Sequence, residues 1–356
     1  MTKREDFLKL GFVGCGRATA TLHLPALQQL PAAKVMALAD VDPDQLKKVA
    51  DQFQIEQRHT DYRALLDDRS LDVIAVCVPA QFHVEIAAAV LEAGKHLFVE
   101  KPLALRLEEC DRLIAKARMT NKKIMVGFNL RHHRLIQETR KIIQRGDLGA
   151  IEAIRSTWTS AIRYHRTMPD WRNRRELGGG ALFEIAVHHF DLWRCLLQSE
   201  MEEIFAFSKS TEWPDETVTI TARLRNGVII SALFGERTSD NNEMEIYGQN
   251  GRLRLSLFRF DGLEFYSTST IEGGIASRLN KFTKTLKELP TGIAILRQGG
   301  DYKVSYRQEW RHFINAIRHD LPVNCSLEDG RAAVQIALAA IESDALGKPV
   351  KLGKNF

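Results

Sequence analysis

LGFVGCGRAT, at residues 10–19, contains the end of an expected strand, Leu8–Val13, and leads into a segment of helical periodicity. A strand that turns at glycines into a helix is the usual setting of a dinucleotide fingerprint, in which a pyrophosphate lies at the helix N-terminus. Gly14 allows the tight turn, and Gly16 lets the backbone approach the phosphates. Thr19 stands where a third glycine or alanine is expected, so we expect looser packing of the helix there. The cofactor contacts predicted from this stretch are Gly14, Gly16, Arg17 and Ala18.

The residues around this stretch alternate between short apolar runs and helical segments, which predicts a parallel sheet covered by helices. The expected strands are Leu8–Val13, Val35–Ala39, Val73–Val78, His96–Val99 and Ile124–Phe128. The expected helices are Pro43–Phe53, Phe82–Ala93 and Leu107–Met119. This pattern indicates a doubly wound Rossmann domain, an α/β fold, at residues 1–127.

Residues 128–356 have a different pattern, which predicts a second, α+β domain. A helix at Arg131–Arg145 is followed by longer alternating strands, such as Ile151–Thr159, Thr217–Leu224 and Val228–Phe234. Hairpin-type turns at residues 225–227 and 249–251 favour a mainly antiparallel sheet. We expect the last helix to pack back towards the N-terminal domain.

The segment Arg278–Leu289 carries leucine and phenylalanine side chains along one side and lysines elsewhere. This amphipathic pattern predicts a packed surface helix, in preference to a membrane binder or a lid. The apolar positions are Leu279, Phe282, Leu286 and Leu289.

The composition is that of an ordinary globular protein, with 44% hydrophobic and 27% charged residues in a chain of 356. The formal charge of +5 is dispersed, which argues against a nucleic-acid-binding protein and tolerates anionic ligands. Five cysteines without regular spacing indicate reduced thiols. No signal-peptide core or membrane-length apolar run is present, so we predict a cytoplasmic protein without a membrane partner.

Asp40 ends the second expected strand, where a carboxylate can accept hydrogen bonds from both ribose hydroxyls of an adenosine. The same charge repels a 2′-phosphate, and no arginine follows it in Val41-Asp42-Pro43. The sequence therefore favours NAD over NADP. The alternative interpretation is a glycine turn followed by a surface aspartate.

Two further groups carry polar side chains at positions suited to chemistry. Glu100-Lys101-Pro102 follows a strand, at the carboxyl edge of the sheet where ligands of such folds bind. Glu184 and His188 share one face of a helix that starts at the triple glycine, residues 178–180. The alternatives are a solvated strand end for the lysine and a buried structural role for the histidine.

Together, these motifs resemble the Gfo/Idh/MocA oxidoreductases, the family of glucose–fructose oxidoreductase and inositol dehydrogenase. The resemblance covers essentially the whole chain and includes Val78-Pro79 followed by His83, Val126-Gly127-Phe128-Asn129 and Glu328-Asp329-Gly330. It implies a Rossmann domain followed by a domain with an open-faced antiparallel sheet. That sheet commonly makes the oligomer interface, so we expect a homodimer or homotetramer. Typical members transfer a hydride between a nicotinamide and a carbinol or carbonyl of a sugar, cyclitol or sugar derivative.

Carried over by position, the family pattern assigns the catalytic roles. Lys101 would hydrogen-bond the reacting hydroxyl and stabilise the developing alkoxide, and His188 would be the general base. Glu184 matches the usual aspartate, and its extra methylene puts its catalytic role in doubt. Ala80 stands where the family often has a polar residue beside the cofactor. The further cofactor contacts that the resemblance implies are Pro79, His83, Glu100, Lys101, Trp171 and Arg172.

Five arginines within residues 163–175 make an acidic or nucleotide-linked sugar a possible substrate, although a solvated loop is equally compatible with them. His132, His133 and His165 lack a zinc spacing, and we predict no metal. We expect His189 to be a buried structural residue and Asp191 to be a helix-surface or packing carboxylate rather than a catalyst.

Two other functions remain open at this point. The first is an NAD-dependent glycoside hydrolase that oxidises its substrate transiently, so that elimination cleaves the glycosidic bond. The second is a non-catalytic dinucleotide sensor that binds a protein partner.

Overall fold

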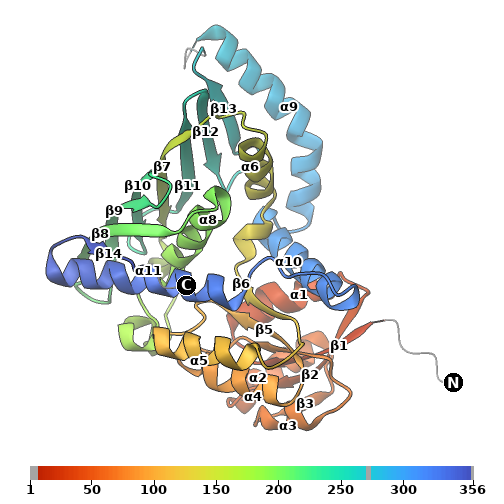
Figure 1. Cartoon of the computed structure of the whole chain (residues 1–356). Coiled ribbons are helices and arrows are strands. Elements are labelled where there is room, and N and C mark those ends of the chain that lie inside the picture. Colours follow the sequence, from red (N-terminus) through yellow and green to blue (C-terminus); the bar gives the residue numbers. More distant parts are fainter. Residues whose placement is uncertain (1–6, 270–273, 354–356) are drawn as a thin grey trace. The chain divides into compact units, whose positions relative to one another are not determined.

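The computed structural model describes residues 7–269 and 274–353, which form two compact units (Figure 1). The first unit comprises Met1–Asn129 and Tyr306–Val334, and the second comprises Leu130–Ser305 and Gln335–Phe356. The units are therefore not two contiguous halves of the chain. Helices α10 (Asp301–Arg318) and α11 (Leu327–Leu346) each contribute residues to both.

A parallel sheet of six strands forms the centre of the first unit, in the order β3-β2-β1-β4-β5-β6. Its strands are β1 (Leu8–Val13), β2 (Ala33–Ala39), β3 (Gln57–His59), β4 (Val73–Val76), β5 (His96–Glu100) and β6 (Ile124–Gly127). Its helices are η1 (Thr19–His23), α1 (Leu24–Leu27), α2 (Pro43–Phe53), α3 (Arg63–Asp67), η2 (Ala80–Phe82), α4 (His83–Glu92) and α5 (Leu107–Ala117). The strand order reverses between β1 and β4, and ligands of such sheets bind at this switch point. The expected doubly wound fold is confirmed.

Local sequence explains why these elements form where they do. All four residues of β4 are buried and apolar, as a strand covered on both faces requires. Helix α2 begins at Pro43, and the carboxylate of Asp42 caps it by accepting from the backbone N–H groups of Asp44 and Gln45. Strand β3 and helix α3 were not predicted, because they are short and β3 contains only polar residues.

The second unit is built on an eight-stranded mixed sheet, in the order β13-β12-β11-β7-β10-β9-β8-β14. Its strands are β7 (Ile151–Thr159), β8 (Met201–Lys209), β9 (Thr217–Leu224), β10 (Ile229–Gly235), β11 (Asn241–Gly248), β12 (Gly251–Ser256), β13 (Leu263–Ser267) and β14 (Val350–Lys351). Strands β7 and β10 pair in parallel, and the other described pairs are antiparallel. The expected α+β class is confirmed.

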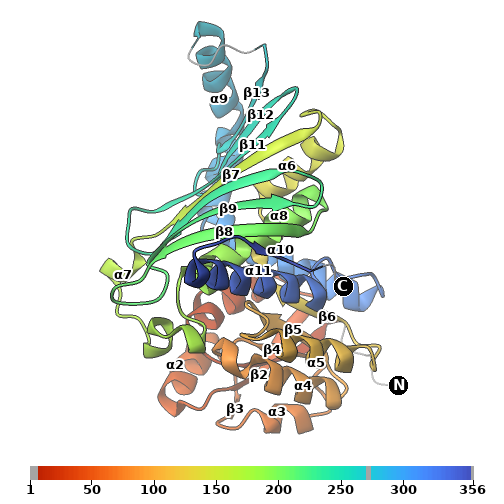
Figure 2. The same cartoon turned by 60° about the vertical axis from the view of Figure 1, so that its left-hand side comes forward.

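Helices α6 (Arg134–Gln144) and α8 (Val187–Leu197) lie on one face of this sheet, and its other face is open (Figure 2). Buried and exposed residues alternate along β9, as a strand with one covered face requires. On the covered face, the indole N–H of Trp193 donates to the hydroxyl of Ser156 at 2.8 Å. This contact joins α8 to β7.

Helix α9 (Ile275–Arg297) is longer than the predicted amphipathic segment, and its apolar stripe is not packed as we expected. The side chains of Leu279, Phe282, Leu286 and Leu289 are all exposed in the described chain. The helix is instead held by another stripe, described below. No helix among the described residues combines the length and apolar character needed to cross a membrane.

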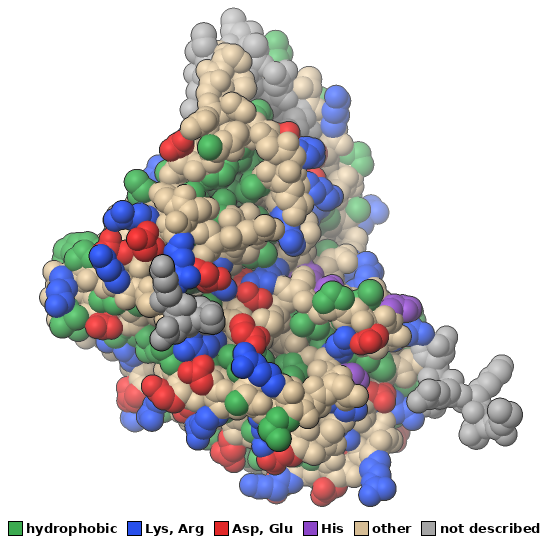
Figure 3. All heavy atoms as spheres, in the orientation of Figure 1, with side chains coloured by type: hydrophobic (Ala, Val, Ile, Leu, Met, Phe, Trp, Pro, Cys, Tyr) green, Lys and Arg blue, Asp and Glu red, His purple; other side chains and the backbone are tan. Residues whose placement is uncertain are grey.

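Charged side chains of both signs are interspersed on the face of the molecule shown in Figure 3. Lysines and arginines alternate there with aspartates and glutamates. The described part of this face therefore shows no large patch of a single charge, in line with the even distribution of charge along the sequence.

Candidate functional site

The glycine loop after β1 has the backbone geometry that the fingerprint predicts. Gly14 has a φ of +97°, and a Cβ there would lie 2.4 Å from the carbonyl oxygen of Cys77, so another residue would be strained and would collide. At Gly16, no described atom lies within 4 Å of the position that a Cβ would take. The loop therefore packs closely against the segment after β4 on one side and leaves open space at Gly16.

Thr19 does not loosen the loop, contrary to our expectation. Its side chain is fully buried, and its hydroxyl donates to the carbonyl oxygen of Gly14 at 2.6 Å. The following turn, η1, is a π-helix, a form that often occurs at functional sites. The threonine hydroxyl therefore closes the turn that a glycine usually shapes.

Asp40 is bound to the glycine loop rather than exposed as an isolated surface aspartate. Its Oδ2 accepts from the backbone N–H of Cys15 at 2.6 Å, and its Oδ1 accepts from that of Asp42 at 2.9 Å. Each carboxylate oxygen keeps a further lone pair for a ligand hydroxyl. Burial, and to a lesser extent Asp40, raises the pKa of the Cys15 thiol to about 12. Cys15 is therefore a protonated thiol beside the loop and not a nucleophile.

Glu100, which precedes Lys101, is held by a buried chain of hydrogen bonds. His23 Nε2 donates to Glu100 Oε1 at 3.0 Å, and the indole N–H of Trp310 donates to His23 Nδ1 at 3.0 Å. An indole nitrogen can only donate, so Nδ1 must be an acceptor and His23 is neutral, with its proton on Nε2. The other carboxylate oxygen accepts from the backbone N–H of Lys101 at 3.1 Å. The carboxylate that the resemblance placed at the cofactor thus fixes the backbone at Lys101.

A second carboxyl, Glu309 of α10, is fully buried near Glu100. Burial, followed by the charge of Glu100, raises the pKa of Glu309 well above its ordinary value. The raised pKa favours the protonated form of Glu309, which avoids a second negative charge beside Glu100. Glu309, His23 and Trp310 carry no motif in the sequence that predicts these contacts.

His83 joins the two loops that carry Pro79 and Lys101. Its Nδ1 lies 2.8 Å from the carbonyl oxygen of Pro102, and its Nε2 lies 2.8 Å from that of Val78. Burial outweighs these two contacts and lowers the pKa of His83, so the ring is neutral and can donate to one carbonyl at a time. The buried ring ties the loop after β4 to the loop after β5.

In the second unit, the triple glycine is explained by close backbone contacts. A Cβ at Gly179 would lie 2.2 Å from the carbonyl oxygen of Arg172. At Gly180, where φ is +98°, a Cβ would lie 2.7 Å from a carboxylate oxygen of Asp215. The glycines therefore let these neighbours approach the start of the helix that carries Glu184 and His188.

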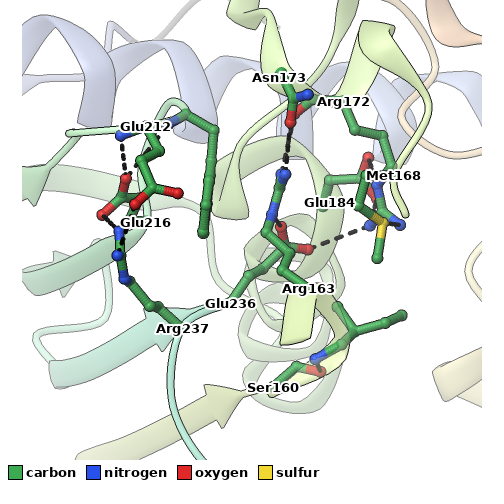
Figure 4. A network of polar contacts seen from close by, with 12 residues as sticks. Ser160, Arg163, Met168, Arg172, Asn173, Glu184, Glu212, Glu216, Glu236 and Arg237 are labelled. Carbon is green, nitrogen blue, oxygen red and sulfur yellow. Dashed lines mark hydrogen bonds and ion pairs between the residues drawn. The ribbon is translucent and has the colours of Figure 1, made fainter. Parts of the chain in front are cut away.

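Glu184 and Arg172, predicted for different roles, form a bidentate ion pair (Figure 4). Arg172 Nε donates to Glu184 Oε1 at 2.8 Å, and an Nη of Arg172 donates to Oε2 at 2.6 Å. The same guanidinium reaches Glu236 at 3.2 Å, and Arg163 Nε donates to Glu236 at 2.7 Å. Burial opposes the charge on Arg172, but Glu184 and Glu236 outweigh it and raise the pKa of Arg172. The carboxylate at position 184 is thus committed to an arginine.

His188 is buried in α8, with its ring centroid 5.3 Å from that of Trp158. In its neighbour His189, Nε2 donates to Oδ1 of Asn242 at 3.0 Å, and burial lowers the pKa of His189 to about 4. Asp191 binds Arg131 in a buried ion pair, at 2.7 and 2.5 Å. Both His189 and Asp191 are therefore buried and hydrogen-bonded within the second unit. Lys101 belongs to the first unit, and His188 belongs to the second.

Three of the five arginines in residues 163–175 are bound to carboxylates of their own unit. Arg163 and Arg172 have the partners given above, and Arg175 donates to Asp215 at 2.6 Å. Arg166 and Arg174 are exposed. Binding of an anionic substrate by this segment would thus depend on Arg166 and Arg174.

No group of three or more potential ligands that could hold a metal ion occurs within residues 7–269 and 274–353. Of the histidines considered for a metal, His133 caps α6 by accepting from the backbone N–H of Leu135 at 3.3 Å. Burial lowers the pKa of His133 to about 4.

Comparison with protein families matches both parts of the chain. Residues 8–128 match the oxidoreductase family with an NAD-binding Rossmann fold, and residues 136–254 match the GFO/IDH/MocA C-terminal domain. The chain belongs to the Gfo/Idh/MocA oxidoreductase family. It is an NAD-binding oxidoreductase, as the fingerprint and Asp40 predicted.

Named family members are similar to the chain over most of its length. The myo-inositol 2-dehydrogenase of Thermotoga maritima is 25% identical over an alignment of 361 positions, which covers 97% of this chain and 98% of that protein. The dTDP-3,4-didehydro-2,6-dideoxy-alpha-D-glucose 3-reductase of Actinomadura kijaniata is 30% identical over 251 residues, 70% of this chain and 74% of that protein. The solved structure of a levoglucosan dehydrogenase in complex with NADH superposes on this chain with a TM-score of 0.82 and 23% sequence identity. The match covers 98% of this chain and 100% of that one. This structural likeness supports the fold.

The residues present fit the family's NAD. The space beside Gly16 leaves the backbone at the start of η1 accessible, and Asp40 lies hydrogen-bonded to the same loop. A phosphate group suits the loop and a ribose hydroxyl suits the carboxylate.

Proposed function

We propose that the chain transfers a hydride between NAD and a CH–OH or C=O carbon of a sugar, cyclitol or sugar derivative. The names of the relatives support this substrate class, since they include an inositol dehydrogenase and a deoxysugar reductase. The observation that carries the proposal is the buried chain from Trp310 through His23 and Glu100 to the backbone of Lys101. A buried network of this kind holds one lysine at the ligand-binding edge of the sheet.

NAD would be held by the glycine loop and by Asp40. The backbone at Gly14 and Gly16, followed by Arg17 and Ala18, would bind the pyrophosphate, and the carboxylate would bind the adenosine ribose. Pro79 and Trp171 are the further contacts that we propose. When bound, NAD supplies the carbon that accepts or donates the hydride.

Lys101 would hydrogen-bond the reacting oxygen through its ammonium group. Loss of a hydride from a carbinol carbon requires loss of the hydroxyl proton, and a cation beside the oxygen stabilises the negative charge that develops. Glu100 fixes the backbone of Lys101, and His83 fixes the adjoining Pro102. We therefore assign Glu100 and His83 positioning roles rather than direct contacts with NAD.

His188 would accept the hydroxyl proton in oxidation and return it in reduction. An imidazole can both accept and donate a proton. Glu184 would act through its ion pair with Arg172, which holds the π-helical turn Leu182–Ala186 before His188. Glu184 and Arg172 are then positioning residues, and His188 acts as the catalytic residue.

The function is tested by incubating the purified protein and NAD with a panel of inositols, neutral sugars, uronates and nucleotide sugars. The proposal expects NADH formation with at least one of them, and its near-complete loss in His188→Ala and Lys101→Met. Arg69→Ala, an exposed change in the first unit, is the control that keeps activity. NADH formation that persists in both active-site variants would contradict the assigned roles.

The same preparation distinguishes the two other functions. A glycoside hydrolase that oxidises transiently would release the aglycone from an aryl glycoside without a steady NADH signal. A dinucleotide sensor would bind NAD and give no turnover on any substrate, and its cellular phenotype would survive loss of Lys101 and His188. Either result would replace the proposed dehydrogenase or reductase activity.

We also propose that the chain assembles into a homodimer or homotetramer through the open face of the eight-stranded sheet. Phe207 of β8 and Ile229 of β10 are both more than half exposed. A polar hollow of about 280 Å³ lies on the strands beyond them, lined by Arg155, Thr157, Asn241, Glu243, Glu245 and Arg254. A face that combines apolar and paired charged groups is suited to a subunit contact. A monomer at all concentrations would refute this assembly.

A further inference from the structure

Helix α9 has an exposed apolar seam with a strict heptad spacing. Its six side chains are separated by three, four, three, four and three residues, and between 43% and 65% of each is exposed. The seam residues are Leu279, Phe282, Leu286, Leu289, Ile293 and Leu296. A repeat of 3.5 residues is the pattern of a helix that pairs with another helix, whereas a helix packed on a globular core has a broader stripe.

The seam is not the side by which α9 is attached to its own unit. The hydroxyl of Thr285 donates to Asp261 at 3.1 Å, a Cβ at Gly292 would lie 2.5 Å from the ring of Phe260, and Ile295 is buried. These residues form a separate stripe on the helix. Figures 1 and 2 both show α9 at the β13 edge of the sheet. Attachment to the unit therefore leaves the seam available.

We propose that α9 pairs in an antiparallel orientation with α9 of a second copy of the chain. The seam is self-complementary in this orientation, since a two-fold axis between Leu286 and Leu289 brings each residue of one copy opposite a residue of the other. The three pairs are Leu279 with Leu296, Phe282 with Ile293, and Leu286 with Leu289. Such a contact is isologous and closed, as most homo-oligomer interfaces are.

The charge along α9 favours the antiparallel orientation over a parallel one. Three basic residues and no acidic one lie in the N-terminal half, at Arg278, Lys281 and Lys284, whereas the C-terminal half has Lys287, Glu288 and Arg297. A parallel pair would bring the two basic halves together, whereas an antiparallel pair separates them.

The exposed area is sufficient for a stable contact. Six apolar side chains at about half exposure leave on the order of 600 Å² on each copy. Pairing would thus cover on the order of 1,200 Å², the lower end of the range for specific interfaces. A lipid surface is the competing partner for a basic amphipathic helix, but it favours a wider apolar face than a single heptad seam.

The oligomeric state of the full chain tests this pairing. We expect Leu286→Glu to halve the mass measured by light scattering, whether the parent is a dimer or a tetramer that also uses the sheet. Thr291→Glu adds the same charge at an exposed position off the seam and should leave the mass unchanged. An unchanged mass in Leu286→Glu would overturn the proposal. The proposal would also be overturned if the parent sedimented with phosphatidylserine vesicles and Leu286→Glu abolished this sedimentation without changing the mass of the protein.

Cysteine crosslinking tests the orientation, and α9 contains no native cysteine. In one antiparallel pair, Leu279 of one copy lies opposite Leu296 of the other, whereas two copies of Leu279 are about 25 Å apart along the helix axis. The double variant L279C/L296C should form a disulfide-linked dimer under oxidation, and L279C or L296C alone should not exceed the parent background. Equal crosslinking by both single variants would overturn the antiparallel arrangement. No crosslinking in any variant would overturn the pairing itself.

Discussion

Removal of Arg172 tests whether its ion pair with Glu184 holds the turn before His188. Arg172→Met leaves the carboxylate of Glu184, which is only 11% exposed, without its two charge-assisted hydrogen bonds. Breaking one partner of a buried ion pair costs about 3–5 kcal/mol. Arg163 still binds Glu236 in this variant, so only the carboxylate of Glu184 loses its partner. We therefore expect a loss at the lower end of this range, about 3 kcal/mol in the free energy of unfolding. For a unit of this size, the loss lowers the Tm by roughly 6–12 °C.

The assay is a double-mutant cycle with Arg172→Met, Glu184→Met and the double variant, read by thermal unfolding and by kcat. A direct pair gives a coupling free energy of about 1–3 kcal/mol, so the double variant is less destabilised than the sum of the single variants. Arg166→Met changes an exposed arginine of the same segment and should cost less than about 0.5 kcal/mol. Additive effects within about 0.5 kcal/mol would refute the pair. A normal kcat in both single variants would refute its positioning role.

Three further predictions concern the cofactor, the Lys101 loop and the pH dependence of stability. Asp40→Ser should raise the KM for NAD about tenfold, the equivalent of ~1.4 kcal/mol, because the ribose loses its carboxylate partner. The ratio of kcat/KM for NAD to kcat/KM for NADP should fall. An unchanged ratio would be evidence against the ribose contact. His83→Phe should lower kcat by roughly 10–100-fold with little change in NAD affinity measured by fluorescence, since a small misplacement of Lys101 suffices; a change confined to NAD affinity would instead indicate direct binding. The pKa of His189 is lowered to about 4, so the unfolded state binds the proton first as pH falls. The contribution of His189 to the free energy of unfolding should therefore be full above pH ~6.5 and fall by about 3 kcal/mol on acidification to pH ~4, measured as the difference between the parent and His189→Gln in urea unfolding. His189→Gln should flatten this dependence, and an unchanged pH profile in that variant would contradict the assignment.

The sequence was sufficient for the elements that depend on local chemistry. Strand β1 and helix α2 have the predicted bounds, because one is a short, mainly apolar segment that ends at the glycine turn and the other starts with an aspartate cap and a proline. Strand β3 has neither signal, since its pairing with β2 provides its only regularity. Edge strands of three polar residues cannot be predicted from periodicity.

The candidate site was only partly predictable for a related reason. Spacing predicts Glu184 and His188 on one helix face, but nothing in the sequence indicates that Arg172 binds the carboxylate of Glu184. The contacts of Glu100 with His23 and of His23 with Trp310 join residues 77 and 287 positions apart. Such contacts depend on the topology of the sheet and on the return of α10 to the first unit.

The exposed seam on α9 shows a limit of a different kind. Its apolar spacing was visible, and it was interpreted as a packed face because most amphipathic helices pack on their own domain. The 3.5-residue repeat was the signal that pointed instead to a partner helix.

The measurement that tests the central claim most directly follows the hydride itself. Each substrate that gives turnover is prepared with deuterium on its carbinol carbon and mixed with NAD and enzyme in a single turnover, and the nicotinamide product is examined by mass spectrometry. We predict that the deuterium is found on the reduced nicotinamide, with a primary isotope effect. In His188→Ala and Lys101→Met, transfer should be slower by roughly 10²–10⁴-fold at unchanged NAD affinity. Product without deuterium in the nicotinamide, or transfer at the parent rate in both variants, would contradict the account.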